Sequence, residues 1–140
     1  MSFRWIREGT TRWDEAKRRI VGGAPPGVFD DRYRALADGA LVPCEWWRVE
    51  DADARVVGFG WLDVVWGDAE ILLAVAPEAE RRGVGAFILS SLEAEARSRG
   101  LGYLTNVVRA THPRAEVVTR FLEGRGFVRQ TDGRLVKRVA

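Results

Sequence analysis

The chain has 140 residues, of which 46% are hydrophobic and 30% charged, and its formal net charge is +2. This composition is typical of a globular protein with one sizeable core, so we expect a single domain over residues 1–140. The longest apolar run, residues 71–76, is far too short to cross a bilayer, and the single cysteine, Cys44, excludes an internal disulfide. We therefore expect a cytoplasmic protein without membrane association.

The basic residues do not form a block along the sequence. Only two of the 22 basic residues are lysines, and the arginines are interleaved with Asp and Glu. A nucleic-acid-binding surface needs its positive charges gathered on one face. The pattern therefore favours a solvated surface, and a nucleic-acid or tRNA partner stays only as a third functional hypothesis.

The first half of the chain predicts one strand and two helices, followed by strands. Residues 3–6 predict a strand, and Thr10 or Thr11 is expected to cap a helix that runs to about Val21. A second, short helix is expected over residues 30–39. Aromatic and β-branched residues then predict an antiparallel pair of strands over residues 41–50 and 55–66, with a third strand after Gly67-Asp68.

Within the strand of residues 41–50, the neighbouring Trp46 and Trp47 are expected to point to opposite faces, and Cys44 is expected to pack inside.

The second half alternates helices with strands. The remaining elements are a helix over residues 86–100, a strand over 103–110, a helix over 114–124 and a hairpin of 127–130 with 135–139.

The most informative stretch runs from Ile71 to Gly85, with the sequence ILLAVAPEAERRGVG. A buried strand ends at Pro77 and leads through a basic loop into a helix. The first N–H groups of a helix lack internal partners, its dipole favours negative charge, and Gly83 and Gly85 let the backbone approach a ligand. This arrangement predicts a phosphate-binding loop.

Two common phosphate-binding loops do not fit this stretch. A P-loop requires lysine directly after glycine, and neither Lys17 nor Lys137 follows one. A dinucleotide fingerprint requires a small residue three positions after its second glycine, where this chain has Ile88.

The segment from Glu70 to Leu104 resembles the central motif of the GNAT family of N-acetyltransferases in order and spacing. That motif is a strand ending V-x-P, here Val75-Ala76-Pro77, then a loop Q/R-x-x-G-x-G/A, here Glu80 to Gly85, and a helix. Glu80 departs from the pattern, because a carboxylate stands where Gln or Arg is usual.

A second element, Arg120 to Phe127, resembles the family's R-F-Y-E-x-x-G-F. The tyrosine that protonates the leaving CoA thiolate in many members is Leu122 here. The resemblance therefore leaves the general acid unassigned, with water, Tyr33 and Tyr103 as the alternatives.

The resemblance implies an α/β (α+β) GNAT fold, a mixed, mostly antiparallel sheet of six or seven strands flanked by about four helices. It implies an acyltransferase that moves an acetyl group from acetyl-CoA directly to a primary amine in a ternary complex, with no metal. The acceptor is a small-molecule or peptide amine. The exposed edge strands of such a fold also allow a homodimer.

The resemblance also implies the positions that hold acetyl-CoA. The pantetheine arm is expected along the backbone of Leu73, Ala74 and Val75, with an N–H near Leu73 as the oxyanion donor. The pyrophosphate is expected on the loop and helix start formed by Arg81, Arg82, Gly83, Val84, Gly85 and Ala86.

Two side chains are candidates for catalysis. Glu70 resembles in setting a glutamate that some members use as base, but it lies one residue closer to Val75, which reverses its face unless a bulge intervenes. His112 titrates in a useful range and is a candidate base or acid. The alternatives are an exposed strand-end glutamate and a structural loop histidine. A second functional hypothesis is an acyl-CoA-binding module without catalysis, because Glu80 and Leu122 both depart from the family pattern.

Overall fold

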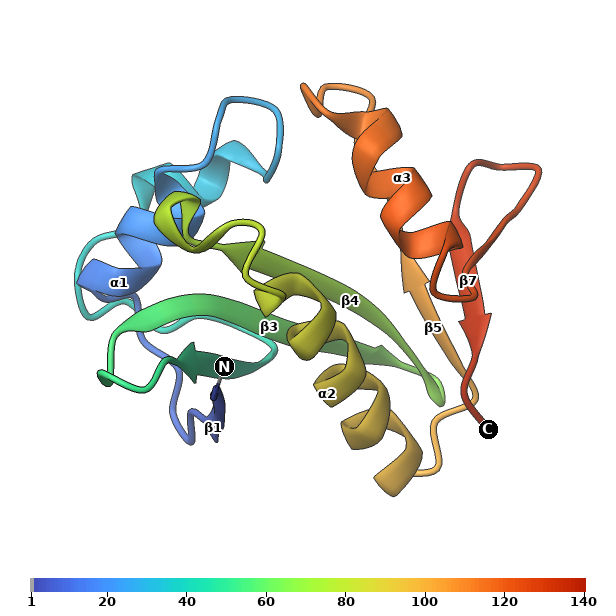
Figure 1. The fold of residues 1–140 in the computed structure, drawn as a ribbon, viewed down its shortest axis with the longest axis horizontal. Coiled ribbons are helices and arrows are strands. Elements are labelled where there is room, and N and C mark those ends of the chain that lie inside the picture. Colours follow the sequence, from blue (N-terminus) through green and yellow to red (C-terminus); the bar gives the residue numbers. More distant parts are fainter. Residues whose placement is uncertain (1) are drawn as a thin grey trace.

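The computed structural model describes residues 2–140. Seven strands form one continuous sheet in the order β1-β2-β3-β4-β5-β7-β6, and only β4 and β5 pair in parallel (Figure 1). The mixed, mostly antiparallel sheet expected from the sequence is confirmed. The strands are β1 (Arg4–Arg7), β2 (Glu45–Glu50), β3 (Val56–Val65), β4 (Asp68–Val75), β5 (Tyr103–Asn106), β6 (Val128–Arg129) and β7 (Leu135–Arg138).

Three α-helices accompany the sheet in the described part of the chain, slightly fewer than the four expected. They are α1 (Glu15–Lys17), which one π-helical turn continues, α2 (Val84–Ser98) and α3 (Ala115–Glu123). The segment predicted as a second helix is a 3₁₀ turn, η2 (Asp31–Ala35). In Figure 1, α2 lies across β3 and β4, whereas α3 lies beside β5 and β7.

The first helix begins later than its sequence indicates. Asp14, not Thr10 or Thr11, is the N-cap, because its carboxylate accepts the Lys17 N–H at 2.9 Å. The threonine segment is extended instead, since the Thr11 carbonyl accepts the Val42 N–H at 2.9 Å. Pairing with a distant segment overrides the local capping signal here.

The helix α2 packs closely on one face of the sheet through glycines of β3. A Cβ atom on Gly60 would lie 2.7 Å from Ile88 of the helix and 2.9 Å from Trp5 of β1. A Cβ atom on Gly58 would lie 3.0 Å from Ile88. Small residues at these positions let the apolar face of α2 approach the strands.

An aromatic cluster covers the opposite face. Trp46 and Trp61 stack with ring centroids 4.0 Å apart, and Tyr33 packs against both. Trp47 lies on the α2 face, stacked on Trp5, so the two neighbouring tryptophans do point to opposite faces. Both are buried.

The strand expected to begin at Leu41 begins only at Glu45. Cys44 has a left-handed backbone (φ 78°), which interrupts the extended conformation, and Leu41 makes only an isolated bridge to Arg12. Cys44 is exposed, not packed inside as expected.

A tight turn sets the register between β3 and β4. Val65 pairs with Asp68, and the two residues between them, Trp66 and Gly67, both have positive φ (52° and 85°). This is the pattern of a two-residue type I′ hairpin. It places Asp63 directly opposite Glu70.

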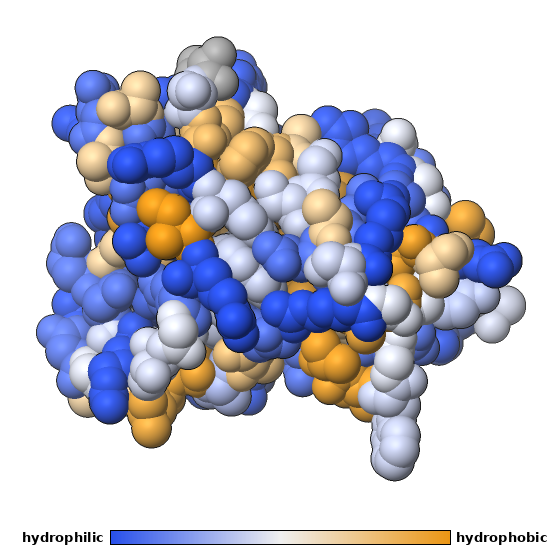
Figure 2. Space-filling model, turned by 90° about the horizontal axis from the view of Figure 1, so that it is seen from below, coloured by the Kyte–Doolittle hydropathy of each residue, from blue (hydrophilic) through white to orange (hydrophobic). Residues whose placement is uncertain are grey.

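Hydrophilic side chains dominate the face drawn in Figure 2, and hydrophobic residues form small separate patches on it. Within residues 2–140 no helix is long and apolar enough to span a membrane.

Candidate active site

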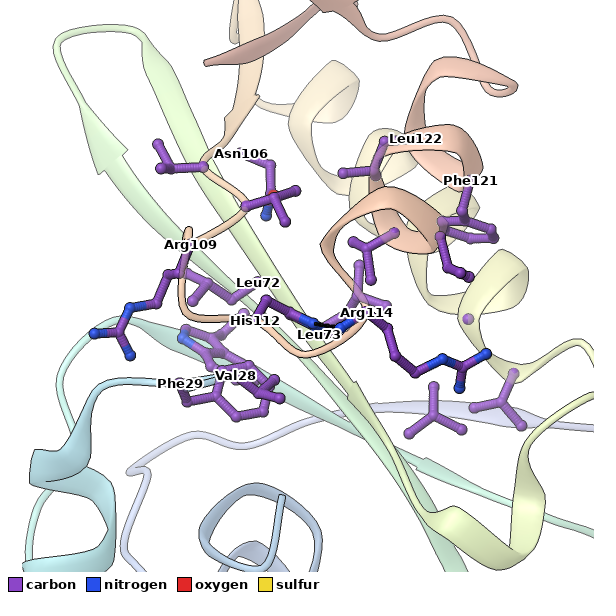
Figure 3. A pocket seen from close by; sticks show the side chains of 18 of the residues that line it. Val28, Phe29, Leu72, Leu73, Asn106, Arg109, His112, Arg114, Phe121 and Leu122 are labelled. Carbon is purple, nitrogen blue, oxygen red and sulfur yellow. Dashed lines mark hydrogen bonds between the residues drawn. The ribbon is translucent and has the colours of Figure 1, made fainter. Parts of the chain in front are cut away.

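The strands β4 and β5 separate after a short parallel contact. They pair only at Ala69 with Leu104 and at Glu70 with Thr105. The Asn106 side chain then donates to the Ile71 carbonyl at 2.8 Å, where β5 ends. The strand predicted to reach residue 110 is therefore shorter. A cavity of about 750 Å³ lies where the two strands diverge (Figure 3).

The backbone of β4 presents unpaired edges to this cavity. The Ala76 N–H donates to Val57 across the β3–β4 ladder at 2.8 Å. Because hydrogen-bonded positions alternate along an antiparallel ladder, Ala74 is also engaged with β3, whereas Leu73 and Val75 direct their N–H and C=O groups toward β5. Leu73 and Val75 line the cavity; Ala74 is buried outside its lining.

The loop before α2 supplies one end of the cavity. Arg81 (φ 66°) and Gly83 (φ 82°) are left-handed, and the loop ends at the free N–H groups of a 15-residue helix. A Cβ atom on Gly85 would lie 3.7 Å from Phe121 and 3.9 Å from Val75, across the opening. The space next to Gly85 therefore belongs to the cavity.

Of the loop and helix-start residues predicted to hold the pyrophosphate, all but one line the cavity. Arg81 and residues 83–86 line the cavity. Arg82 does not, since its guanidinium lies 3.9 Å from the Asp51 carboxylate in a different surface depression. Of the two loop arginines, Arg81 alone can therefore contribute charge inside the cavity.

Three arginines of the second half, Arg109, Arg114 and Arg125, also line the cavity and were not predicted from the sequence. Arg125 lies over the Phe121 ring at 4.6 Å. Figure 3 shows the Arg114 side chain extending toward the loop before α2. No local motif marks Arg114 or Arg125, because only the packing of α3 beside the opening brings these two to it.

Glu70 lies at the other end of the cavity, on the face opposite α2. The β3–β4 register is continuous, so no bulge restores the face of the family's glutamate. Burial, and secondarily the charge of Asp63 opposite it, raise the pKa of Glu70 above its ordinary value. Both carboxylates line the cavity together with Leu72 and Trp61.

His112 lines the cavity from the loop between β5 and α3. Its Nδ1 accepts the Arg114 N–H at 2.9 Å, so the neutral ring carries its proton on Nε2. Burial, and secondarily the Arg114 charge, lower the pKa of His112 below 6.5, so the ring is neutral at pH 7. In this state Nε2 is a hydrogen-bond donor. It can donate to a leaving group or to a polarised atom, but it cannot accept a proton as a base.

The two tyrosines named as alternative acids differ in position. Tyr103 lies outside the cavity lining, whereas Tyr33 lines it. The Tyr33 hydroxyl accepts a hydrogen bond from Arg32 at 3.3 Å, which leaves its own O–H free to donate. Leu122, which stands in the position of the family's tyrosine, is buried in the cavity wall. Burial, and then Asp63, raise the pKa of Cys44, which disfavours its thiolate. Across residues 2–140 no group of three His, Cys, Asp or Glu side chains is placed to hold a metal ion.

The comparison with known families shows which family the chain belongs to. The acetyltransferase (GNAT) family matches residues 9–127, most of the chain. The chain belongs to the GNAT family. The resemblance drawn from Val75 to Gly85 is thereby confirmed.

Curated relatives of this GNAT chain include two mycothiol acetyltransferases. The one from Clavibacter michiganensis subsp. michiganensis (strain NCPPB 382) is 34% identical over 95 residues, which cover 67% of this chain and 30% of the relative. The one from Clavibacter sepedonicus is 38% identical over 66 residues, 46% of this chain and 21% of the relative. The chain thus spans less than a third of the length of either relative.

Solved structures share the fold at lower identity. The ribosomal-protein-S18-alanine N-acetyltransferase from Escherichia coli matches with a TM-score of 0.64 at 18% identity, covering 99% of this GNAT chain and 95% of that one. The PaiA N-acetyltransferase from Thermoplasma acidophilum, solved in complex with coenzyme A, matches with a TM-score of 0.58 at 23% identity, covering 66% and 59%.

Proposed function

We propose that residues 1–140 form one N-acetyltransferase domain, which transfers an acetyl group from acetyl-CoA directly to a primary amine in a ternary complex. The observation that carries the proposal is the opening between β4 and β5. It presents the unpaired backbone of Leu73 and Val75 along one wall, with the start of α2 at one end and Glu70 at the other.

The α2 end of the cavity suits the pyrophosphate of acetyl-CoA. The N–H groups at the helix start and the Arg81 and Arg114 guanidinium groups all line it. The left-handed backbone at Arg81 and Gly83 lets successive N–H groups converge on an anion. Glu80 is exposed at the rim, where solvent screens its charge.

The wall of the cavity suits the pantetheine arm and the thioester. The backbone groups of Leu73 and Val75 accept an extended ligand as a strand accepts a neighbour. The Leu73 N–H then points at the thioester carbonyl oxygen and stabilises the negative charge that develops on it. Asn106 is already engaged with Ile71 and fixes the width of the opening.

Proton transfer falls to Glu70 and His112. Glu70 removes a proton from the ammonium group of the acceptor, and its raised pKa brings it nearer to neutral pH, as a base needs. The Nε2 proton of His112 donates a hydrogen bond to the departing sulfur. His112 thereby takes over part of the role of the family's tyrosine, whose position is Leu122 in this chain.

The proposal is tested by thermal unfolding with and without acetyl-CoA, using two variants of one residue. At about 100 times its Kd, acetyl-CoA adds roughly 2.7 kcal/mol and raises the Tm by several degrees. Gly85→Leu keeps a good helix former but fills the space beside Phe121, so the shift should vanish. Gly85→Ala makes only ordinary contacts and should keep it. No shift in the unchanged protein would contradict the CoA site.

Amine-dependent release of CoA, measured on a panel of small amines and peptides, tests the reaction itself. Release that requires both an amine and Glu70 supports the enzyme. A thermal shift with acetyl-CoA but no release on any amine would instead support the hypothesis of a binding module.

A further inference from the structure

We infer that the acceptor of this protein is a small cationic amine with an apolar body, and that Asp63 is the residue that selects its positive charge. The inference rests on the proposed function, because it names the acceptor class of the same cavity.

The part of the cavity opposite α2 has an apolar wall. Phe29, Trp61 and Leu72 all line it. The Phe29 ring lies 5.7 Å from that of Trp61, which pairs across the strands with Leu72. Figure 3 shows Phe29 and Leu72 close to His112. An apolar or aromatic body packs against such a wall.

Two carboxylates stand beside this wall. Asp63 and Glu70 occupy directly opposed positions on β3 and β4, with their side chains on the same face of the sheet. Both line the cavity. Like charges directly opposite one another destabilise a pair of strands. A cation bound at both would remove that repulsion.

The other acidic residues on strands are already satisfied. Glu50 pairs with Arg4 at 2.6 Å and with Arg48 at 2.8 Å. Glu45 pairs with two arginines, and the Asp68 carboxylate accepts the Tyr103 N–H at 3.1 Å.

Asp63 and Glu70 differ from these residues. Among residues 2–140 neither has an ion pair or a side-chain hydrogen bond. Of the five carboxylates on strands, Asp63 and Glu70 are the two with neither an ion pair nor a hydrogen bond, and both line the cavity. A ligand cation is the partner that the arrangement lacks.

The two carboxylates have different roles toward the ammonium group. Asp63 holds the ammonium by a charge-assisted hydrogen bond, while Glu70 takes one of its protons. The freed electron pair on nitrogen forms the C–N bond to the acetyl carbon, the C–S bond breaks, and its electron pair stays on sulfur. A second proton leaves nitrogen and neutralises the thiolate, so the products are the amide and the CoA thiol, and Glu70 releases its proton to water.

This arrangement also predicts which amines are rejected. An α-amino acid carries a carboxylate next to its amine and would bring a third negative charge to Asp63 and Glu70. A neutral molecule of the same shape would gain nothing from either carboxylate. Selectivity should therefore follow the charge around the amine more than the shape of the apolar body.

The test is calorimetric binding to the protein loaded with CoA, with three probes of similar shape. Phenethylamine should bind at least about tenfold more tightly than phenylalanine or phenethyl alcohol, a difference of about 1.4 kcal/mol in binding free energy. Asp63→Asn should weaken phenethylamine by about tenfold, and Asp63→Glu should restore part of the loss. Asp53→Asn, in the exposed β2–β3 turn, is the matched control and should change nothing.

Turnover distinguishes this inference from the proposed function. In acetyl transfer to phenethylamine, Asp63→Asn should raise KM more than it lowers kcat. Equal binding of phenethylamine and phenethyl alcohol, or an Asp63→Asn variant that binds like the unchanged protein, would overturn the inference while acetyl transfer to other amines stands. Binding of phenethylamine that depends on Asp63, without any CoA release, would support the acceptor class and contradict the proposed reaction.

Discussion

The Thr111 hydroxyl donates a hydrogen bond to the Gly27 carbonyl at 2.8 Å, although the two residues are 84 positions apart. Gly27 lies in the loop before η2, and Thr111 lies in the loop between β5 and α3. Their chain neighbours Val28 and His112 both line the cavity. This hydrogen bond therefore joins the two loops that flank the acceptor end of the cavity, and it restrains His112, the residue that follows Thr111.

Gly27→Ala should separate these loops. The position has φ +92°, and a Cβ atom there would lie 2.1 Å from the Thr111 carbonyl oxygen. We expect the Tm to fall by several degrees and the KM for the amine to rise, while the Tm shift with acetyl-CoA persists. Gly39→Ala is the control, because Gly39 has φ +83° with nothing within 4 Å. Equal amine KM values in the two variants would show that the contact does not shape the acceptor end.

Glu70→Gln should lower kcat by about 10²–10⁴-fold, the usual contribution of a general base. Because the base must be deprotonated, kcat/KM of the unchanged protein should rise with pH through the pKa of Glu70, which burial and Asp63 raise. The variant should lack this rise. Asp63→Asn should move the rise to lower pH, because it removes the charge that opposes ionisation of Glu70. An unchanged profile in Glu70→Gln would exclude Glu70 as the base.

The same carboxyl group makes a separate prediction for stability. The folded state holds the Glu70 proton more tightly than the unfolded state, so stability is lost as pH rises from about the ordinary value of 4.5 through the raised pKa. Glu70→Gln lacks this loss, so its Tm relative to the unchanged protein should increase between pH 4 and pH 7. Glu116→Gln, exposed on α3, is the control for removing one carboxylate away from the cavity.

The sequence alone predicts the unit formed by β4, its loop and α2, because this part of the site is local. Val75, Gly83 and Gly85 lie within eleven consecutive residues, and strand, turn and helix follow one another without a distant partner. The alternation of Trp46 and Trp47 is predictable for the same reason. Local periodicity fixes which face each side chain takes.

The opposition of Asp63 and Glu70 was not predicted, because it depends on the register between two strands. A two-residue turn sets this register, and Asn-Gly or Asp-Gly is its usual signal. Here the first turn residue is Trp66, a bulky side chain at φ 52° that is 99% exposed, and the sequence placed the break one residue later, at Gly67-Asp68. A shift of one residue changes which residue of β4 stands opposite Asp63. Arg114 and Arg125 escape prediction in a different way, since only tertiary packing brings α3 to the opening.

Substitutions of His112 should distinguish its contribution to stability from its contribution to the reaction. Its Nδ1 accepts the Arg114 N–H just before α3, a helix whose own N-cap has no side-chain hydrogen bond. His112→Ala should therefore lower stability by about 0.5–1.5 kcal/mol. His112→Asn should recover most of that loss, because an Asn side chain can accept the N–H two residues on.

The chemical contribution should not be recovered in the same way. If Nε2–H donates to the departing sulfur, both variants should lower kcat by about tenfold or more, with little change in the Tm shift caused by acetyl-CoA. Because the pKa of His112 is lowered below 6.5, the ring stays neutral above that pH and kcat should show no His112-dependent change between pH 7 and pH 8. A kcat of His112→Ala equal to that of the unchanged protein would reduce the role of His112 to that of a loop anchor. The departing thiolate would then take its proton from the amine nitrogen or from water without help from this side chain.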